Sequence, residues 1–77
     1  MPKYDIYLEF ASFEKPGRIP GQCGDLARDI FARYEDENVR QREGVLSCWL
    51  TVEGGEIPIL GAAPKGWSRN NPVYENW

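Results

Sequence analysis

The sequence predicts a single small α+β domain in which one helix packs on a three-stranded sheet, in the chain order strand, helix, strand, strand. Three patterns support this prediction: apolar residues alternate with polar ones near the N-terminus, they recur at helical spacing further on, and a Gly-Gly pair separates two later apolar runs. A chain of 77 residues is expected to form one core. We expect the β-α-β-β domain to span residues 1–62, followed by an irregular aromatic tail at 63–77.

The first strand is expected over residues 3–11. Tyr4, Ile6, Leu8 and Phe10 alternate with polar residues, which places the even-numbered side chains on the core face. Residues 12–21 contain two prolines and two glycines and are expected to form a loop, with Phe13 turned inward.

The helix is expected after this loop because seven apolar residues form one stripe at helical spacing. These are Ile19, Cys23, Leu26, Ala27, Ile30, Phe31 and Tyr34. Pro20 suits the first helical position, and Asp25 is the alternative start because nearby glycines weaken the first turn. Since acidic residues oppose the negative end of a helix, we expect the helix to end between Tyr34 and Glu37. Residues 38–44 then form a charged connector.

Residues 44–62 are expected to form a β-hairpin that turns at residues 53–56. Symmetric pairing places Trp49 opposite Leu60. Pro58 lacks an N–H group and therefore belongs on an edge strand, which gives the sheet order 1-2-3. A right-handed crossover through the helix would make the first two strands parallel, and long loops leave an antiparallel pairing open.

Composition argues against several classes of function. The chain has no histidine and therefore lacks the commonest general base and zinc ligand. Its net charge of −3 disfavours binding to nucleic acid. The N-terminus does not resemble a signal peptide and no apolar run is long enough to span a membrane, so a cytoplasmic location is expected. We expect no catalytic residue, metal or cofactor, because the carboxylates are predicted to face water and no phosphate-binding glycine motif is present.

The two cysteines fall on the predicted apolar faces of the helix and the sheet. Cys23 and Cys48 are therefore expected to be buried thiols that meet inside the domain. A disulfide or a redox-active pair is the alternative.

The predicted functional site is the sheet face opposite the helix, together with nearby acidic residues and the aromatic tail. Tryptophan and tyrosine are enriched among interface hot spots. The expected partner-binding residues are Asp5, Tyr7, Glu9, Trp49, Leu60, Glu35, Asp36, Glu37, Trp67, Tyr74 and Trp77. The competing interpretation is that the tail folds back over this face and forms a second small core.

These features predict a non-catalytic protein–protein interaction module whose partner has a basic surface. In size and charge only, the chain resembles small inhibitors encoded by phages and mobile elements, including anti-CRISPR proteins. That resemblance implies an inhibitor or adaptor. Two alternatives remain: a homo-oligomeric structural module that buries Tyr7, Trp49 and Leu60 between copies, and a cysteine-dependent redox protein.

Overall fold

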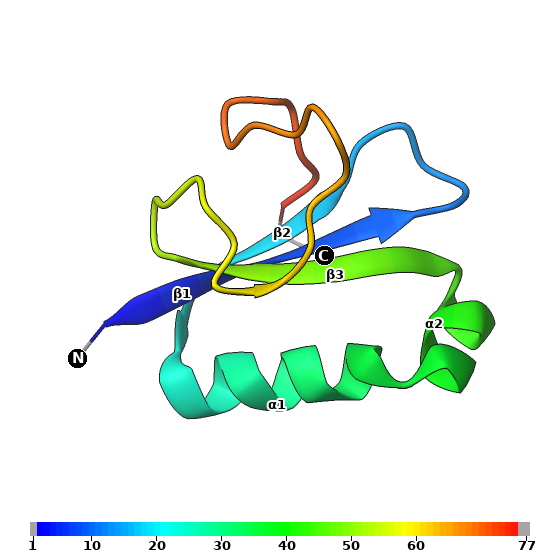
Figure 1. Ribbon diagram of the computed structural model, residues 1–77, viewed down its shortest axis with the longest axis horizontal. Coiled ribbons are helices and arrows are strands. Elements are labelled where there is room, and N and C mark those ends of the chain that lie inside the picture. The colour runs from blue at the N-terminus through cyan, green and yellow to red at the C-terminus, as the bar shows by residue number, and fades with distance from the viewer. Residues whose placement is uncertain (1, 76–77) are drawn as a thin grey trace.

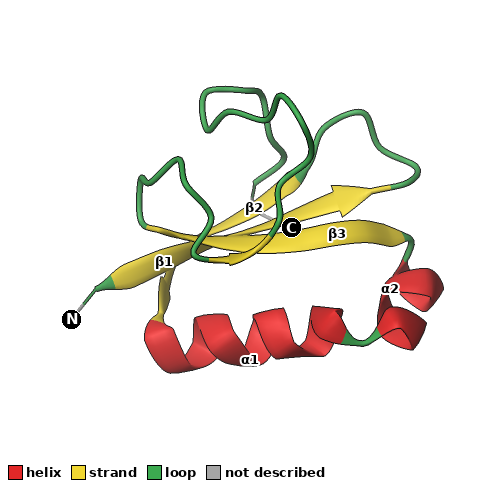
Figure 2. Cartoon of the chain, viewed as in Figure 1, coloured by secondary structure: helices red, strands yellow, loops and turns green. Residues whose placement is uncertain are grey.

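The computed structural model describes residues 2–75, and in this part of the chain a four-stranded antiparallel sheet carries two helices on one face (Figures 1 and 2). The sheet order is β2-β1-β3-β4. The elements are β1 (Lys3–Phe10), β2 (Gly17–Cys23), α1 (Gly24–Glu35), α2 (Glu37–Glu43), β3 (Val45–Val52) and β4 (Leu60–Gly61). The α+β class is confirmed, with one more strand and one more helix than the sequence predicted.

β1 is a central strand, and both of its faces are buried. Ile6 and Leu8 face the helices and form the main core with Ala27 of α1 and Leu50 of β3. On the opposite face the side chain of Tyr7 is also buried. A central strand covered on both sides must satisfy polar groups internally, which bears on the functional site below.

β2 corrects the prediction that residues 12–21 form a loop throughout. It pairs antiparallel with β1, with Ile19 opposite Ile6, and the register shifts near the end of the strand. The glycines and prolines are tolerated because β2 is an edge strand: Pro20 need not donate to a ladder, and Gly21 adopts a φ of 66°.

The additional strand also decides the direction of β3. The chain leaves β2 beside the start of β1, and α1 carries it back across the sheet (Figure 1). β3 therefore enters from the far end and pairs antiparallel with β1, with Trp49 opposite Tyr7. Of the two pairings that the sequence left open, the antiparallel one is confirmed and the parallel one is wrong, because β1 and β2 form a hairpin first.

α1 ends at Glu35, which confirms the predicted end between Tyr34 and Glu37, but the segments on either side of it depart from the prediction. α1 starts at Gly24, so the stripe residue Cys23 belongs to β2. The expected connector at 38–44 is wrong, because α2 fills most of it. Asp36 has an extended backbone and ends α1. Its carboxylate then caps α2 by accepting a hydrogen bond from the backbone N–H of Asn38 at 2.8 Å. Gly44, with a φ of 73°, ends α2.

The predicted hairpin exists but is shifted by one residue. Trp49 lies opposite Gly61 rather than Leu60, and β4 is only two residues long. Residues 53–59 form a longer loop because the N–H of Gly54 is bound elsewhere and Pro58 cannot donate to the ladder. Of the helices in residues 2–75, neither is long and apolar enough to cross a membrane.

Candidate protein-binding surface

The segment that follows β4, residues 62–75, folds back over the sheet face opposite the helices (Figure 1). Tyr7 and Trp49 stack with ring centroids 5.5 Å apart, and Trp67 packs edge-on against them at 4.9 and 5.4 Å. Tyr7 and Trp49 are fully buried, so the expectation that they face solvent is wrong and neither is accessible to a partner in this arrangement. The indole N–H groups of Trp49 and Trp67 are buried without an acceptor in the described part of the chain, so packing holds this cluster.

Asp5 is likewise buried, contrary to the prediction that it lies on a solvated acidic face. Its carboxylate accepts hydrogen bonds from the backbone N–H of Gly21 at 3.1 Å and of Gly54 at 3.0 Å. It also accepts one from Nη1 of Arg69 at 3.0 Å. The alternating pattern of β1 shows only which face Asp5 lies on. It does not show whether that face is covered, because the covering segment is remote in sequence.

Arg69 is the residue that the sequence analysis missed. Its Nη1 also donates to the hydroxyl of Tyr7 at 2.7 Å, so one guanidinium fixes the C-terminal segment to two buried side chains of β1. The sequence held one clue to this contact. An aspartate on a buried central strand needs a cationic partner, and the aromatic tail contains an arginine.

The same segment closes the outer edge of β2. The backbone of Tyr74 accepts from the N–H of Arg18 and donates to the carbonyl of Pro16, both at 2.8 Å, and Arg18 forms an ion pair with Glu75. Further along, Pro20 has no N–H, and its carbonyl accepts from the side chain of Gln22 at 2.9 Å. This edge is poorly suited to pair with a strand from another chain.

Exposed aromatic side chains gather where the β1–β2 loop meets this segment. Phe13 is 58% exposed and Tyr74 41% exposed, and no other aromatic side chain in residues 2–75 is as open. Their ring centroids are 5.8 Å apart, and Phe13 also packs edge-on against Phe10 at 5.3 Å. The expectation that Phe13 turns inward is wrong, because its ring packs against Phe10 and Tyr74 at the surface of the molecule. We call Phe10, Phe13 and Tyr74 the aromatic end.

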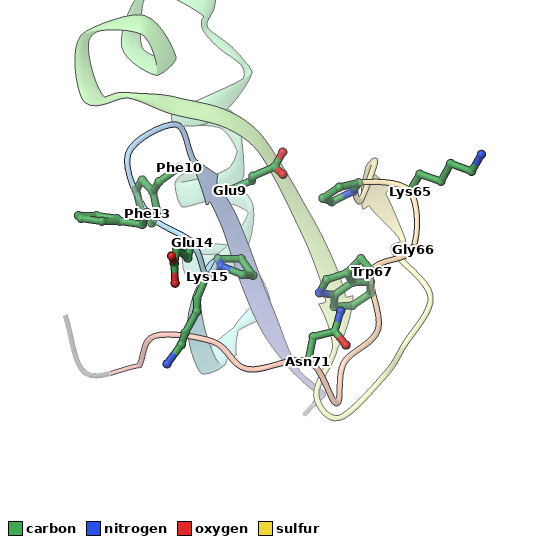
Figure 3. A pocket seen from close by; sticks show the side chains of 11 residues that line it. Glu9, Phe10, Phe13, Glu14, Lys15, Lys65, Gly66, Trp67 and Asn71 are labelled. Atoms are coloured by element: carbon green, nitrogen blue, oxygen red, sulfur yellow. The ribbon is translucent and has the colours of Figure 1, made fainter.

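A pocket of about 210 Å³ adjoins the aromatic end (Figure 3). The β1–β2 loop forms one wall, the C-terminal segment the other, and the end of β1 lies between them. Its lining residues are Glu9, Phe10, Phe13, Glu14, Lys15, Pro16, Pro64, Lys65, Gly66, Trp67 and Asn71. Two residues expected to bind a partner, Glu9 and Trp67, therefore meet here. Glu9 accepts a hydrogen bond from the hydroxyl of Ser47 at 3.2 Å and forms no ion pair within residues 2–75.

The other expected acidic residues lie on the helix side of the sheet, at the junction of α1 and α2 (Figure 1). Glu35, Asp36 and Glu37 are exposed, although Asp36 is also the cap of α2. Nearby, the hydroxyl of Tyr34 and the guanidinium of Arg33 donate to Glu43, which lowers the pKa of that carboxyl group. This junction is therefore a solvated acidic corner with internal pairing.

A second set of exposed apolar side chains lies on the β3–β4 loop and on the two strand residues that flank it. Its members are Val52, Ile57, Ile59 and Leu60, and we call it the aliphatic patch. Ile57 is the most open, at 79%. Leu60 is exposed, but the expectation that it shares a sheet face with Tyr7 and Trp49 is wrong, because the shifted register pairs it with Leu50 of the main core. Trp77, also expected to bind a partner, lies outside the described residues.

The cysteines do not meet. Cys23 is exposed, Cys48 is buried, and both are free thiols. The expectation of two buried thiols is wrong because Cys23 ends the edge strand β2 instead of belonging to the helix. Burial raises the pKa of Cys48 to about 12, so its thiol stays protonated and is a weak nucleophile at neutral pH. Within residues 2–75, no three acidic or cysteine side chains cluster in a way that could hold a metal ion.

Comparisons with protein-family models, curated proteins and solved structures find no match to this chain.

Proposed function

We propose that this protein is a non-catalytic interaction module that binds another protein through the aromatic end. The observation that carries the proposal is that Phe13 and Tyr74, the two most exposed aromatic side chains of residues 2–75, lie in contact at one edge of the molecule. Aromatic residues are enriched at the centres of interfaces, where a few of them supply most of the binding free energy.

The arrangement of these side chains favours tight binding because it is already ordered. Phe13 packs against Phe10 and Tyr74, and the backbone of Tyr74 is held by two hydrogen bonds. Lys15 lies over the ring of Tyr74, with its Nζ 5.2 Å from the centroid. Little conformational entropy remains to be lost when a partner docks on such a surface.

The charge of the chain indicates the chemistry of the partner. The net charge of −3 and the exposed acidic corner at the α1–α2 junction favour approach to a basic surface. An acidic module that covers such a surface would act as an inhibitor or an adaptor.

The test is affinity capture from the source organism with the tagged chain, followed by mass spectrometry. Phe13→Ala should lose the captured protein, while Leu46→Ala should retain it. Leu46 is a matched control because it is 59% exposed and lies on β3, outside the aromatic end. Near-ultraviolet circular dichroism establishes that both variants keep the fold. A partner that is captured equally well by folded Phe13→Ala would refute the proposal.

A second candidate function, a homo-oligomeric module, is favoured by the aliphatic patch alone. Tyr7 and Trp49 cannot contribute as first expected, but Ile57 could bury its exposed surface against a second copy. Light scattering after size-exclusion chromatography over a concentration series tests this. Dimers that dissociate in Ile57→Asp would support self-association, and a strict monomer at high concentration would refute it.

A further inference from the structure

We propose that the pocket beside the aromatic end receives an arginine side chain of the partner protein. This inference rests on the proposed function, because it names the chemical group that the partner would insert next to Phe13. It is carried by the size of the pocket, the aromatic side chains of its walls and the half-buried carboxylate of Glu9 in its lining.

The size of the pocket fits a single side chain. Pockets for drug-sized ligands and cofactors usually measure about 300–1,000 Å³, and this one measures about 210 Å³. Its position next to Phe13 and Phe10 places it where a docked protein surface would cover it. An inserted side chain is therefore a better match than a free metabolite.

The walls suit a flat cation with an aliphatic stem. Phe10 and Phe13 stand on one side and Trp67 on the other (Figure 3). Pro16 and Pro64 also line the pocket. A guanidinium group stacks on aromatic faces and is more weakly hydrated than an ammonium group. These properties favour arginine over lysine.

The charge inside the pocket is complementary to that cation. Glu9 is half-buried, forms no ion pair in the described chain, and uses its carboxylate for one hydrogen bond from Ser47. A carboxylate has acceptor positions for two parallel N–H groups of a guanidinium. Glu14 of the β1–β2 loop contributes a second negative charge.

The two lysines of the lining do not cancel this charge locally. Lys65 extends away from the pocket, and Lys15 points toward the C-terminal segment (Figure 3). The Nζ of Lys15 is placed over the ring of Tyr74, which is not a lining residue. Among the four charged lining residues, only Glu9 is half-buried, and the other three are exposed.

The test is an NMR titration of the whole chain labelled with ¹⁵N, using N-acetyl-arginine methylamide as the probe. Its citrulline analogue, which has the same shape without the charge, is the matched ligand control. The arginine probe should shift the Gly66 amide and the Trp67 indole N–H signals with a dissociation constant on the order of millimolar. The citrulline probe should bind at least about tenfold more weakly, since a hydrogen bond to a charged group contributes about that much.

Two variants assign the effect to the pocket. Glu9→Gln should weaken arginine binding by about tenfold or more, whereas Glu56→Gln, at an exposed position on the distant β3–β4 loop, should leave it unchanged. Equal binding of both probes, no shift with either, or full affinity in folded Glu9→Gln would overturn the inference. If Glu9→Gln fails to fold, the comparison of the two probes on the unmodified chain still decides.

The outcome is separable from that of the proposed function. If the pocket binds the arginine probe specifically but Phe13→Ala still captures the partner, the inference about the pocket stands and the aromatic end is refuted as the docking surface. Capture that requires Phe13 without arginine-specific binding would refute the pocket alone.

Discussion

Replacing Asp5 with asparagine should destabilise this protein more than any conservative change on its surface. The side chain of Asp5 is 1% exposed, and its carboxylate accepts from two backbone N–H groups and from Arg69, whose side chain is 28% exposed. Asparagine offers one oxygen and one NH₂ group, so at least one of the donors must face another donor. The guanidinium of Arg69 also loses its counter-charge.

The magnitude follows from these contacts. Removing one partner of a buried ion pair costs about 3–5 kcal/mol, and partial exposure of Arg69 places this case near about 3 kcal/mol. Chains of this size are stable by only about 4–12 kcal/mol. At about 4–8 °C for each kcal/mol, Asp5→Asn should lower Tm by about 12 °C or more.

Urea unfolding followed by tryptophan fluorescence measures the change in the free energy of unfolding. Asp29→Asn, at an exposed position on α1, is the matched control and should change stability by less than about 0.5 kcal/mol. Arg69→Met should also destabilise, and the double variant should cost less than the sum of the two single changes by about 1 kcal/mol or more. A cost below about 1 kcal/mol for Asp5→Asn, or strict additivity with Arg69→Met, would refute the reasoning.

Two further changes have predictable effects on stability. Gly61→Ala should cost about 2–4 kcal/mol in urea unfolding, because Gly61 has a φ of 73° and an added Cβ would lie 2.3 Å from the carbonyl oxygen of Cys48; Gly66→Ala, with a φ of 84° but open space around it, should cost only about 1 kcal/mol. Equal costs would show that backbone strain alone decides. Burial raises the pKa of Cys48 from 9.0 to about 12, so between these pH values the unfolded chain releases a proton that the folded chain keeps, and stability should fall by up to about 1.4 kcal/mol per pH unit. Unfolding at pH 8 and pH 10.5 should reveal this loss, and Cys48→Ala should reduce it; an unchanged slope in that variant would assign the loss to other groups.

Local patterns in the sequence predict the elements of the main core better than they predict the edges of the sheet. The alternation of β1 and the helical spacing of Ala27, Ile30 and Phe31 report directly on one buried face, and these residues form the core in the structure. β2 was not predicted, because proline and glycine at positions 20 and 21 normally indicate a loop. They are compatible with a strand only at the edge of a sheet, which is where β2 lies. Whether a strand is an edge depends on the whole sheet, and local pattern does not contain that information.

The functional surface was harder to predict for a related reason. The prediction that Tyr7 and Trp49 lie on the face opposite the helices is confirmed. The competing interpretation, that the tail folds back over this face, is also confirmed. Both side chains are buried by a segment that is fixed through a contact between Asp5 of β1 and Arg69, which lie 64 residues apart along the chain. No periodic pattern reports a contact of this kind. The candidate site in the structure therefore differs from the predicted one. It lies at the border of the covering segment, where the side chains of Phe13 and Tyr74 are exposed.

The energetics of the covering segment argue that a partner binds at this border and not beneath it. To expose Tyr7 and Trp49, the segment would have to break the pair between Arg69 and Asp5 and withdraw Trp67 from its two aromatic neighbours. Loss of the ion pair costs about 3 kcal/mol and withdrawal of Trp67 about 3–5 kcal/mol, which together make the opened form rarer than the closed one by a factor of about 10⁴–10⁶. A partner that selected the opened form would lose the same factor in apparent affinity. Phe13 and Tyr74 require no such opening, and for this reason the aromatic end is the stronger candidate for the docking surface.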